Sequence, residues 1–113
     1  MRLLSILLIG GLAGVVSLPA HADDATPTAT IVIERFAFEP AEIAVKAGRK
    51  VAFVNKDQMP HGVVGEGAGG EVFRSEDQIE EGGTFSVTLT KPGEIAVSCG
   101  LHANMKGRIT VTQ

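Results

Sequence analysis

Apolar and polar residues alternate with a period of two along most of the chain after residue 30. The alternation is clearest in "FSVTL" (85–89) and "IAVSC" (95–99), where every second residue is apolar. Successive side chains of a β-strand point to opposite faces, so this pattern is typical of strands that are buried on one side. No segment shows a convincing helical period.

Turn-forming residues separate these runs, at "AG" (47–48), "NKD" (55–57), "EGG" (81–83) and "KPG" (91–93). Seven or eight short strands within about 90 residues are typical of an antiparallel sandwich with Greek-key connections. We therefore predict an all-β Greek-key sandwich. The run "GEGAGG" (65–70) fits a dinucleotide-binding pattern, but no helix follows it, which favours a loop between two strands.

The N-terminus has the pattern of an export signal. Arg2 precedes an apolar run over 3–18, and "AHA" (20–22) forms a small-x-small cleavage site. We predict a signal peptide over 1–22, a polar leader over 23–29 and one domain over 30–113. This interpretation places the mature protein in the periplasm, with no membrane anchor after cleavage.

Charge and cysteine content narrow the function further. The chain has ten Lys and Arg against 13 Asp and Glu, and removing Arg2 leaves a net charge of −4. Nucleic acid is therefore an unsuitable partner, because phosphate binding requires a basic surface. Cys99 is the only cysteine. It cannot form an internal disulfide, so it is either buried or committed to other chemistry.

The segment "SCGLHANMKG" (98–107) brings soft ligands together. Cys99, His102 and Met105 are spaced three residues apart. Cys99 is the last inward-facing residue of its strand. We expect a short loop after it, before the strand pattern resumes at Lys106. The side chains of Cys99, His102 and Met105 can therefore converge on one point. His61 follows the turn "NKDQMP" and can reach the same end of a sandwich.

A thiolate, two imidazoles and a thioether form a selective set of ligands. Magnesium and calcium require oxygen ligands, and structural zinc usually takes four strong ligands. Two His, one Cys and a long axial Met form the blue-copper arrangement. Two alternatives stay open: Cys99 as a small buried hydrophobe, and a Cys–His nucleophile, which would leave His61 and Met105 unexplained.

Three segments resemble the cupredoxin family, and most closely its amicyanin and plastocyanin branch. They are "FAFEPAEIAVKAGRKVAFVNKD", "MPHGVV" and "CGLHANMKGRITV". The resemblance implies one type 1 copper ion with His61, Cys99 and His102 as equatorial ligands and Met105 as the axial ligand. Gly62 stands where the family commonly has Asn.

The resemblance implies a single-electron carrier rather than an enzyme, and a monomer. The alternative is a copper delivery or storage protein that uses the same ligands. We expect redox partners such as a cytochrome c or a periplasmic dehydrogenase or reductase. An uncharged patch of Leu101, Ala103, Met59 and Pro60 around His102 suits transient docking, with the acidic remainder steering a basic partner.

Overall fold

The computed structural model describes residues 10–11, 14, 29–100 and 102–113, without the side chains of His102 and Ala103. Most of the predicted signal peptide, most of the predicted leader and Leu101 lie outside this description. The described residues form strands and no helix, so none of them forms a helix long and apolar enough to cross a membrane.

Nine strands follow one another along the described chain. They are β1 (Ala29–Glu34), β2 (Ala37–Glu39), β3 (Glu42–Lys46), β4 (Arg49–Asn55), β5 (Val64–Gly67), β6 (Gly70–Arg74), β7 (Thr84–Leu89), β8 (Gly93–Cys99) and β9 (His102–Thr112).

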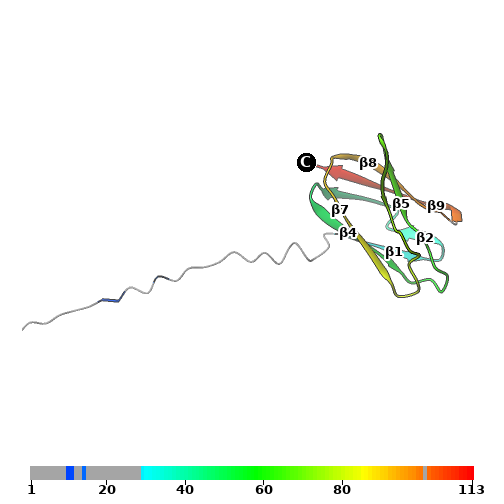
Figure 1. Ribbon diagram of the computed structural model, residues 1–113, viewed down its shortest axis with the longest axis horizontal. Helices are drawn as coiled ribbons and strands as arrows, with labels where there is room; N and C mark the ends of the chain where they lie inside the picture. The colour runs from blue at the N-terminus through cyan, green and yellow to red at the C-terminus, as the bar shows by residue number, and fades with distance from the viewer. Residues whose placement is uncertain (1–9, 12–13, 15–28, 101) are drawn as a thin grey trace, which may run out of the picture.

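These strands form two sheets that pack as a sandwich (Figure 1), with the orders β2-β1-β4-β7 and β3-β9-β8-β5-β6. The predicted all-β sandwich is confirmed. The described chain has nine strands rather than seven or eight; they include β2, a three-residue strand that pairs with β1, and β6, which pairs with β5. Two pairs, β1–β4 and β3–β9, are parallel, because the chain changes sheet between β2 and β3 and again between β3 and β4.

The core lies between the sheets and contains a cluster of phenylalanine rings. Phe53 is fully buried, and its ring centroid lies 6.2 Å from that of Phe38, 5.8 Å from that of Phe73 and 6.1 Å from that of Phe85. Edge-on and tilted contacts of this kind stabilise a core beyond the area that they bury. The alternating residues of β8 are also buried, as the sequence pattern predicted.

The hairpin of β8 and β9 differs from the prediction. Ser98 pairs with Lys106, and the next residue, Cys99, pairs with His102. Between these two pairs β9 has three additional residues, whereas β8 has none. The expected loop up to Lys106 is therefore wrong, because β9 begins at His102 and includes Met105. This irregularity in register lets the strand turn back directly after Cys99.

We predict that Gly65→Ala destabilises the fold. A Cβ at Gly65 would lie 2.1 Å from Cε2 of Phe73, whose ring packs against Phe53 and Phe85. Overpacking of a core lowers the free energy of unfolding by about 1–3 kcal/mol. For a domain of this size, each kcal/mol lowers Tm by roughly 4–8 °C. Thermal unfolding of the metal-free protein measures this effect.

Gly62→Ala is the matched control. Its Cβ would meet only the Ser75 hydroxyl oxygen, at 3.9 Å, which is an ordinary contact. We expect a change in Tm within the scatter of surface substitutions. Equal Tm losses in the two variants would contradict the assignment of Gly65 to a close-packed position.

Candidate metal centre

Three predicted ligands are buried at one end of the sandwich. His61 follows β4, Cys99 ends β8 and Met105 lies in β9; their exposed fractions are 0%, 3% and 2%. His61 Nδ1 lies 3.8 Å from Cys99 Sγ. The structure therefore brings an imidazole and a thiol together from separate segments, with Met105 in the same core cluster as Cys99.

The His102 side chain lies outside the described residues, although its backbone pairs with Cys99 at the start of β9. Its role as a ligand stays a prediction. Among the described residues, no group of three or more His, Cys, Asp and Glu side chains is placed to bind a metal. The candidate centre thus combines one His, one Cys and one Met with a fourth ligand predicted from sequence.

A carboxylate orients His61. Its Nε2 lies 2.8 Å from Oδ2 of Asp57, which has 11% of its side chain exposed. An ionised carboxylate only accepts hydrogen bonds, so the hydrogen-bond network assigns the ring proton to Nε2. The lone pair of Nδ1 is then directed to the side of the ring where Cys99 lies. This arrangement favours one tautomer and one ring orientation of His61, the predicted ligand.

The same carboxylate accepts two backbone hydrogen bonds, from N–H of Arg35 at 2.7 Å and from N–H of Phe36 at 3.0 Å. Burial raises the pKa of Asp57, but the hydrogen bonds from Phe36, Arg35 and His61 outweigh burial and hold the pKa below its usual value of 3.8. Asp57 is therefore ionised at neutral pH, as its role toward His61 requires.

A buried amide shapes the turn that carries Asp57. Asn55 is fully buried; its Nδ2 donates to the carbonyls of Met59 and Ile79, at 2.9 and 2.8 Å. Its Oδ1 accepts a 2.8 Å hydrogen bond from N–H of Asp57. His61 and Ile79 also exchange two backbone hydrogen bonds. These bonds fix the path of the chain from the end of β4 to His61.

An exposed aromatic ring covers one edge of His61. The centroids of the Phe36 and His61 rings are 5.4 Å apart, and the planes meet at 82°. Phe36 is 48% exposed, and Met59, two residues before His61, is 51% exposed. Met59 is therefore a surface side chain, as the predicted uncharged patch requires.

Sequence reasoning did not identify Asn55, Asp57 and Phe36 as parts of the site. The pattern Asn-x-Asp was assigned to a turn and to the end of a segment that resembles the cupredoxin family, but not to the metal site. The sequence did contain a signal for this role, since two acceptor side chains lie shortly before a candidate ligand. Ligating histidines usually have a carboxylate or carbonyl partner. Phe36 begins the segment "FAFEPAEIAVKAGRKVAFVNKD", which resembles the cupredoxin family, but nothing in the pattern assigned its side chain to the site.

The observed donors fit a first-row transition metal. Nitrogen and sulfur ligands bond such ions at roughly 2.0–2.3 Å, so two of them on one ion lie no more than about 4.4 Å apart. The 3.8 Å separation of His61 Nδ1 and Cys99 Sγ satisfies this limit. A buried thiol and thioether favour copper over the hard cations.

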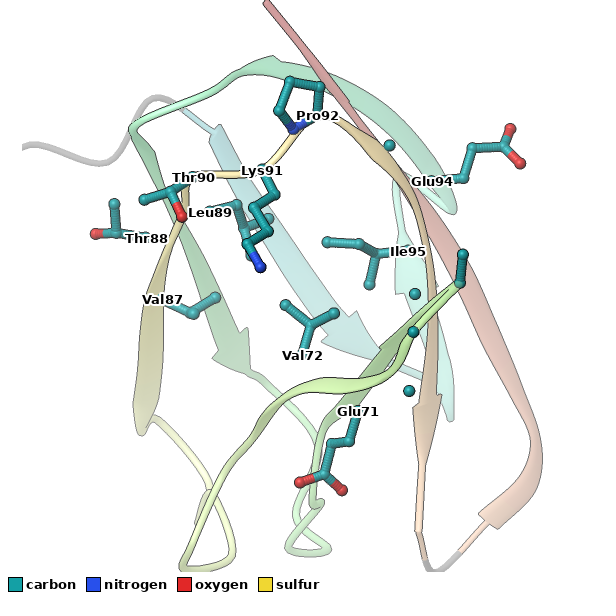
Figure 2. Close-up of a pocket in the computed structure, with 15 residues that line it drawn as sticks. Glu71, Val72, Val87, Thr88, Leu89, Thr90, Lys91, Pro92, Glu94 and Ile95 are labelled. Atoms are coloured by element: carbon teal, nitrogen blue, oxygen red, sulfur yellow. The ribbon is translucent and has the colours of Figure 1, made fainter.

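A hollow of about 560 Å³ at the opposite end of the sandwich has different chemistry (Figure 2). It lies at the end of β7 and the start of β8, and it is open between the two sheets. Figure 2 shows the Lys91 side chain among the apolar side chains of Val72, Val87, Leu89 and Ile95. No His, Cys or Met lines it, so it does not compete with the candidate metal centre.

Comparison with known proteins agrees with this geometry. The model of the cupredoxin-like domain matches residues 5–111. The chain therefore belongs to the cupredoxin family. The members of this family hold one type 1 copper ion, and the donors described above fit that metal.

Similar proteins include amicyanin from Paracoccus versutus, which is 32% identical over 100 residues, covering 82% of this chain and 72% of the relative. Chloroplastic plastocyanin from Fritillaria agrestis is 40% identical over 86 residues, which are 66% of this chain; this chain spans only 52% of that protein. A reduced amicyanin variant superimposes with a TM-score of 0.66 and 28% identity, over 73% of this chain and 79% of its own. Another amicyanin variant, in its Cu(I) form at pH 4, also gives 0.66, with 27% identity over the same shares.

We predict that Asp57→Asn weakens Cu(II) binding roughly 10–100-fold, the usual effect of losing an outer-shell partner. The neutral amide is a weaker acceptor for Nε2–H, so it makes the imidazole a poorer donor. Competition titration with a Cu(II) chelator measures the affinity. Asp77→Asn removes the same charge from an exposed position and should leave the affinity unchanged.

The tautomer can be tested without metal. Nitrogen chemical shifts of the copper-free protein should show His61 protonated at Nε2. Protonation of the neutral ring at Nδ1 in the wild type would contradict the role assigned to Asp57.

Proposed function

We propose that this chain is a type 1 copper protein that carries single electrons between redox proteins. His61, Cys99 and His102 are the equatorial ligands and Met105 is the axial ligand. The observation that supports this best is the 3.8 Å approach of two buried donors, His61 Nδ1 and Cys99 Sγ, in a cupredoxin fold. Bound copper supplies the chemistry by alternating between Cu(I) and Cu(II).

The protein contributes fixed positions and exclusion of water. His61 is held by Asp57 on one side, and Cys99 is held in a paired strand on the other. Burial of His61, Cys99 and Met105 leaves little room for water as an additional ligand. Ligands that move little on oxidation or reduction lower the reorganisation that electron transfer requires. We propose a carrier and not an enzyme, because the amicyanin and plastocyanin relatives are electron carriers.

The biological setting belongs to the same proposal. The chain is exported by the signal peptide over 1–22, and the domain over 30–113 works in the periplasm as a monomer. Its partners are redox proteins such as a cytochrome c or a periplasmic dehydrogenase or reductase. The exposed Met59, beside Pro60, supports an apolar contact area at the end where the ligands lie.

Copper delivery or storage would use the same ligands and remains the second candidate. The rate of copper release distinguishes a delivery protein from an electron carrier, because a delivery protein must give up its ion to an acceptor. The burial of the donors supports slow release. Rapid transfer of copper to a chelator, without reversible redox behaviour, would favour delivery.

We predict that Cys99→Ser abolishes the intense blue absorption of the Cu(II) protein, because a sulfur-to-copper charge-transfer band requires the thiolate. Visible spectra at one equivalent of Cu(II) measure this change. Ser98→Ala, at the neighbouring and partly exposed position, is the control and should stay blue. A blue Cys99→Ser protein would show that the ligand assignment is wrong.

We predict that Met105→Gln keeps copper but lowers the reduction potential, because an oxygen donor stabilises Cu(II) more than a thioether does. Redox titration followed at the blue band measures the shift. Met59→Gln makes the same change at an exposed methionine outside the site and should leave the potential unmoved. Complete loss of copper from Met105→Gln at neutral pH would argue for a different geometry.

A further inference from the structure

The hollow at the end of the sandwich opposite the candidate metal centre lies where the two sheets stop. In the described chain, β6 is the last strand of one sheet and β7 is the last strand of the other, and both strands line the hollow. Its volume of about 560 Å³ lies within the usual range of ligand pockets, about 300–1,000 Å³. The hollow is therefore large enough for a small molecule.

Apolar side chains from both sheets form the wall of this hollow. Leu89 and Ile95 belong to the buried core, with exposed fractions of 2% and 4%. Val87 adds a half-buried side chain from β7. Val72 is 51% exposed and is one of three exposed large hydrophobic side chains among the described residues. A ligand that covers this wall removes apolar surface from water, which favours binding.

A β-bulge places Val72 at the hollow. Successive residues of β5, Gly65 and Glu66, pair with Phe73 and Glu71 of β6. Val72 lies between these two partners and therefore has no residue opposite it on β5. Bulges of this kind redirect a side chain and are over-represented at sheet edges and beside active sites. Figure 2 shows the Val72 side chain together with the other apolar side chains that line the hollow.

One cation shares the hollow with these apolar side chains. Lys91 lies in the turn between β7 and β8, and Figure 2 shows its side chain extending from this turn into the hollow. Lys91 is exposed, and it forms no ion pair with a side chain in the part of the chain that the structure describes. A lysine stem can lie on apolar surface while its ammonium group stays available to an anion.

The two carboxylates that line the hollow are paired with arginines. Glu71 Oε1 accepts hydrogen bonds from Nε and Nη2 of Arg74, at 2.9 and 2.6 Å. Glu94 Oε1 lies 3.9 Å from Nη1 of Arg108. Figure 2 shows both carboxylates directed away from Lys91. They therefore do not neutralise the ammonium group in the hollow.

Other charged groups at this end lie outside the hollow. Arg49 and Lys50 begin β4 beside the end of β7, and Lys46 ends β3. Glu66 lies on β5, where its charge acts on an arginine of β6, and the C-terminal Gln113 follows β9. None of these five residues lines the hollow. Among the described residues, an anion that enters it meets a single lining cation, with further positive charge on β4.

We propose that this hollow binds a single-chain carboxylate amphiphile, such as a medium-chain fatty acid. The carboxylate pairs with Lys91, and the alkyl chain covers Val72, Val87 and Ile95. A neutral lipid would not use the ammonium group, and a small hydrophilic anion would leave the apolar wall in water. This inference goes beyond the proposed function and does not depend on copper, because the hollow and the candidate metal centre lie at opposite ends of the sandwich.

NMR titration of the isotope-labelled protein with decanoate tests the site. The amide signals of Val72, Leu89 and Lys91 should shift with one saturable dissociation constant, while those of Asp57 and His61 at the other end stay in place. A fully buried CH₂ group tightens binding about fourfold, so two partly buried groups should make decanoate bind roughly fivefold more tightly than octanoate. Equal affinities for the two acids would overturn the proposal.

Lys91→Met tests the charge, because it removes the ammonium group and keeps an apolar stem. Loss of an exposed ion pair should weaken decanoate binding roughly fivefold at low ionic strength. Decanol, which has no charge, should bind equally to the variant and the wild type. Lys56→Met makes the same change at an exposed position beyond the other end of β4 and should leave decanoate binding unchanged. Equal decanoate binding by Lys91→Met and the wild type would contradict the proposed ion pair.

Val72→Ser tests the apolar contact and should weaken the binding of decanoate and of decanol severalfold. Met59→Ser is the matched control, because Met59 is also 51% exposed but lies outside the hollow. If Val72→Ser unfolds, Val72→Ala replaces it and should give a smaller loss. Shifts that never saturate and spread over the whole surface would indicate detergent-like adsorption only and would overturn the proposal. Dimers in sedimentation, with Val72 signals that move with protein concentration and not with decanoate, would instead assign the hollow to a second copy of this chain.

Discussion

One carboxylate organises the end of the sandwich where the candidate ligands lie. Asp57 accepts hydrogen bonds from the backbone of Arg35, from the backbone of Phe36 and from the ring of His61. Two of these donors, Arg35 and Phe36, have φ of 56° and 59° at a strained hairpin tip. They lie more than 20 residues earlier in the sequence, and the third donor is a predicted ligand. Removing this acceptor would leave the strained tip unsupported and the buried imidazole free to choose either tautomer. The local geometry of the candidate site therefore depends on a group outside the proposed ligand set.

The fold and the site rely on the same packing. His61 follows a strand of one sheet, whereas Cys99 and Met105 belong to strands of the other. The distance of His61 from Cys99 and Met105 is consequently set by how the two sheets pack. The Phe53 cluster fills the space between the two sheets. Close-packed interiors resist small displacements. Such a core limits the movement of the donors when the charge of a bound ion changes by one.

The alternating pattern predicted the all-β sandwich and the inward position of Cys99, because alternation and burial are local consequences of strand geometry. The start of β9 could not be predicted, since an irregular register depends on the partner strand. The hydrogen bonds of Asp57 to Arg35 and Phe36 could not be predicted from the sequence either, because they join residues 22 and 21 positions apart. The His102 side chain lies outside the described residues, so that part of the predicted ligand set is supported by sequence alone.

Net charge is a poor guide to where partners dock on so small a protein. The Debye length is about 8 Å at physiological ionic strength, so a partner in contact with Phe36 senses Arg35, Lys56 and Asp57 more strongly than charged groups at the far end. The overall negative charge acts on approach, while local charge acts in the encounter complex. The hairpin tip illustrates this local balance, because the exposed Arg35 and Lys56 lie beside the ionised carboxylate of Asp57, which accepts hydrogen bonds from N–H of Arg35 and of Phe36.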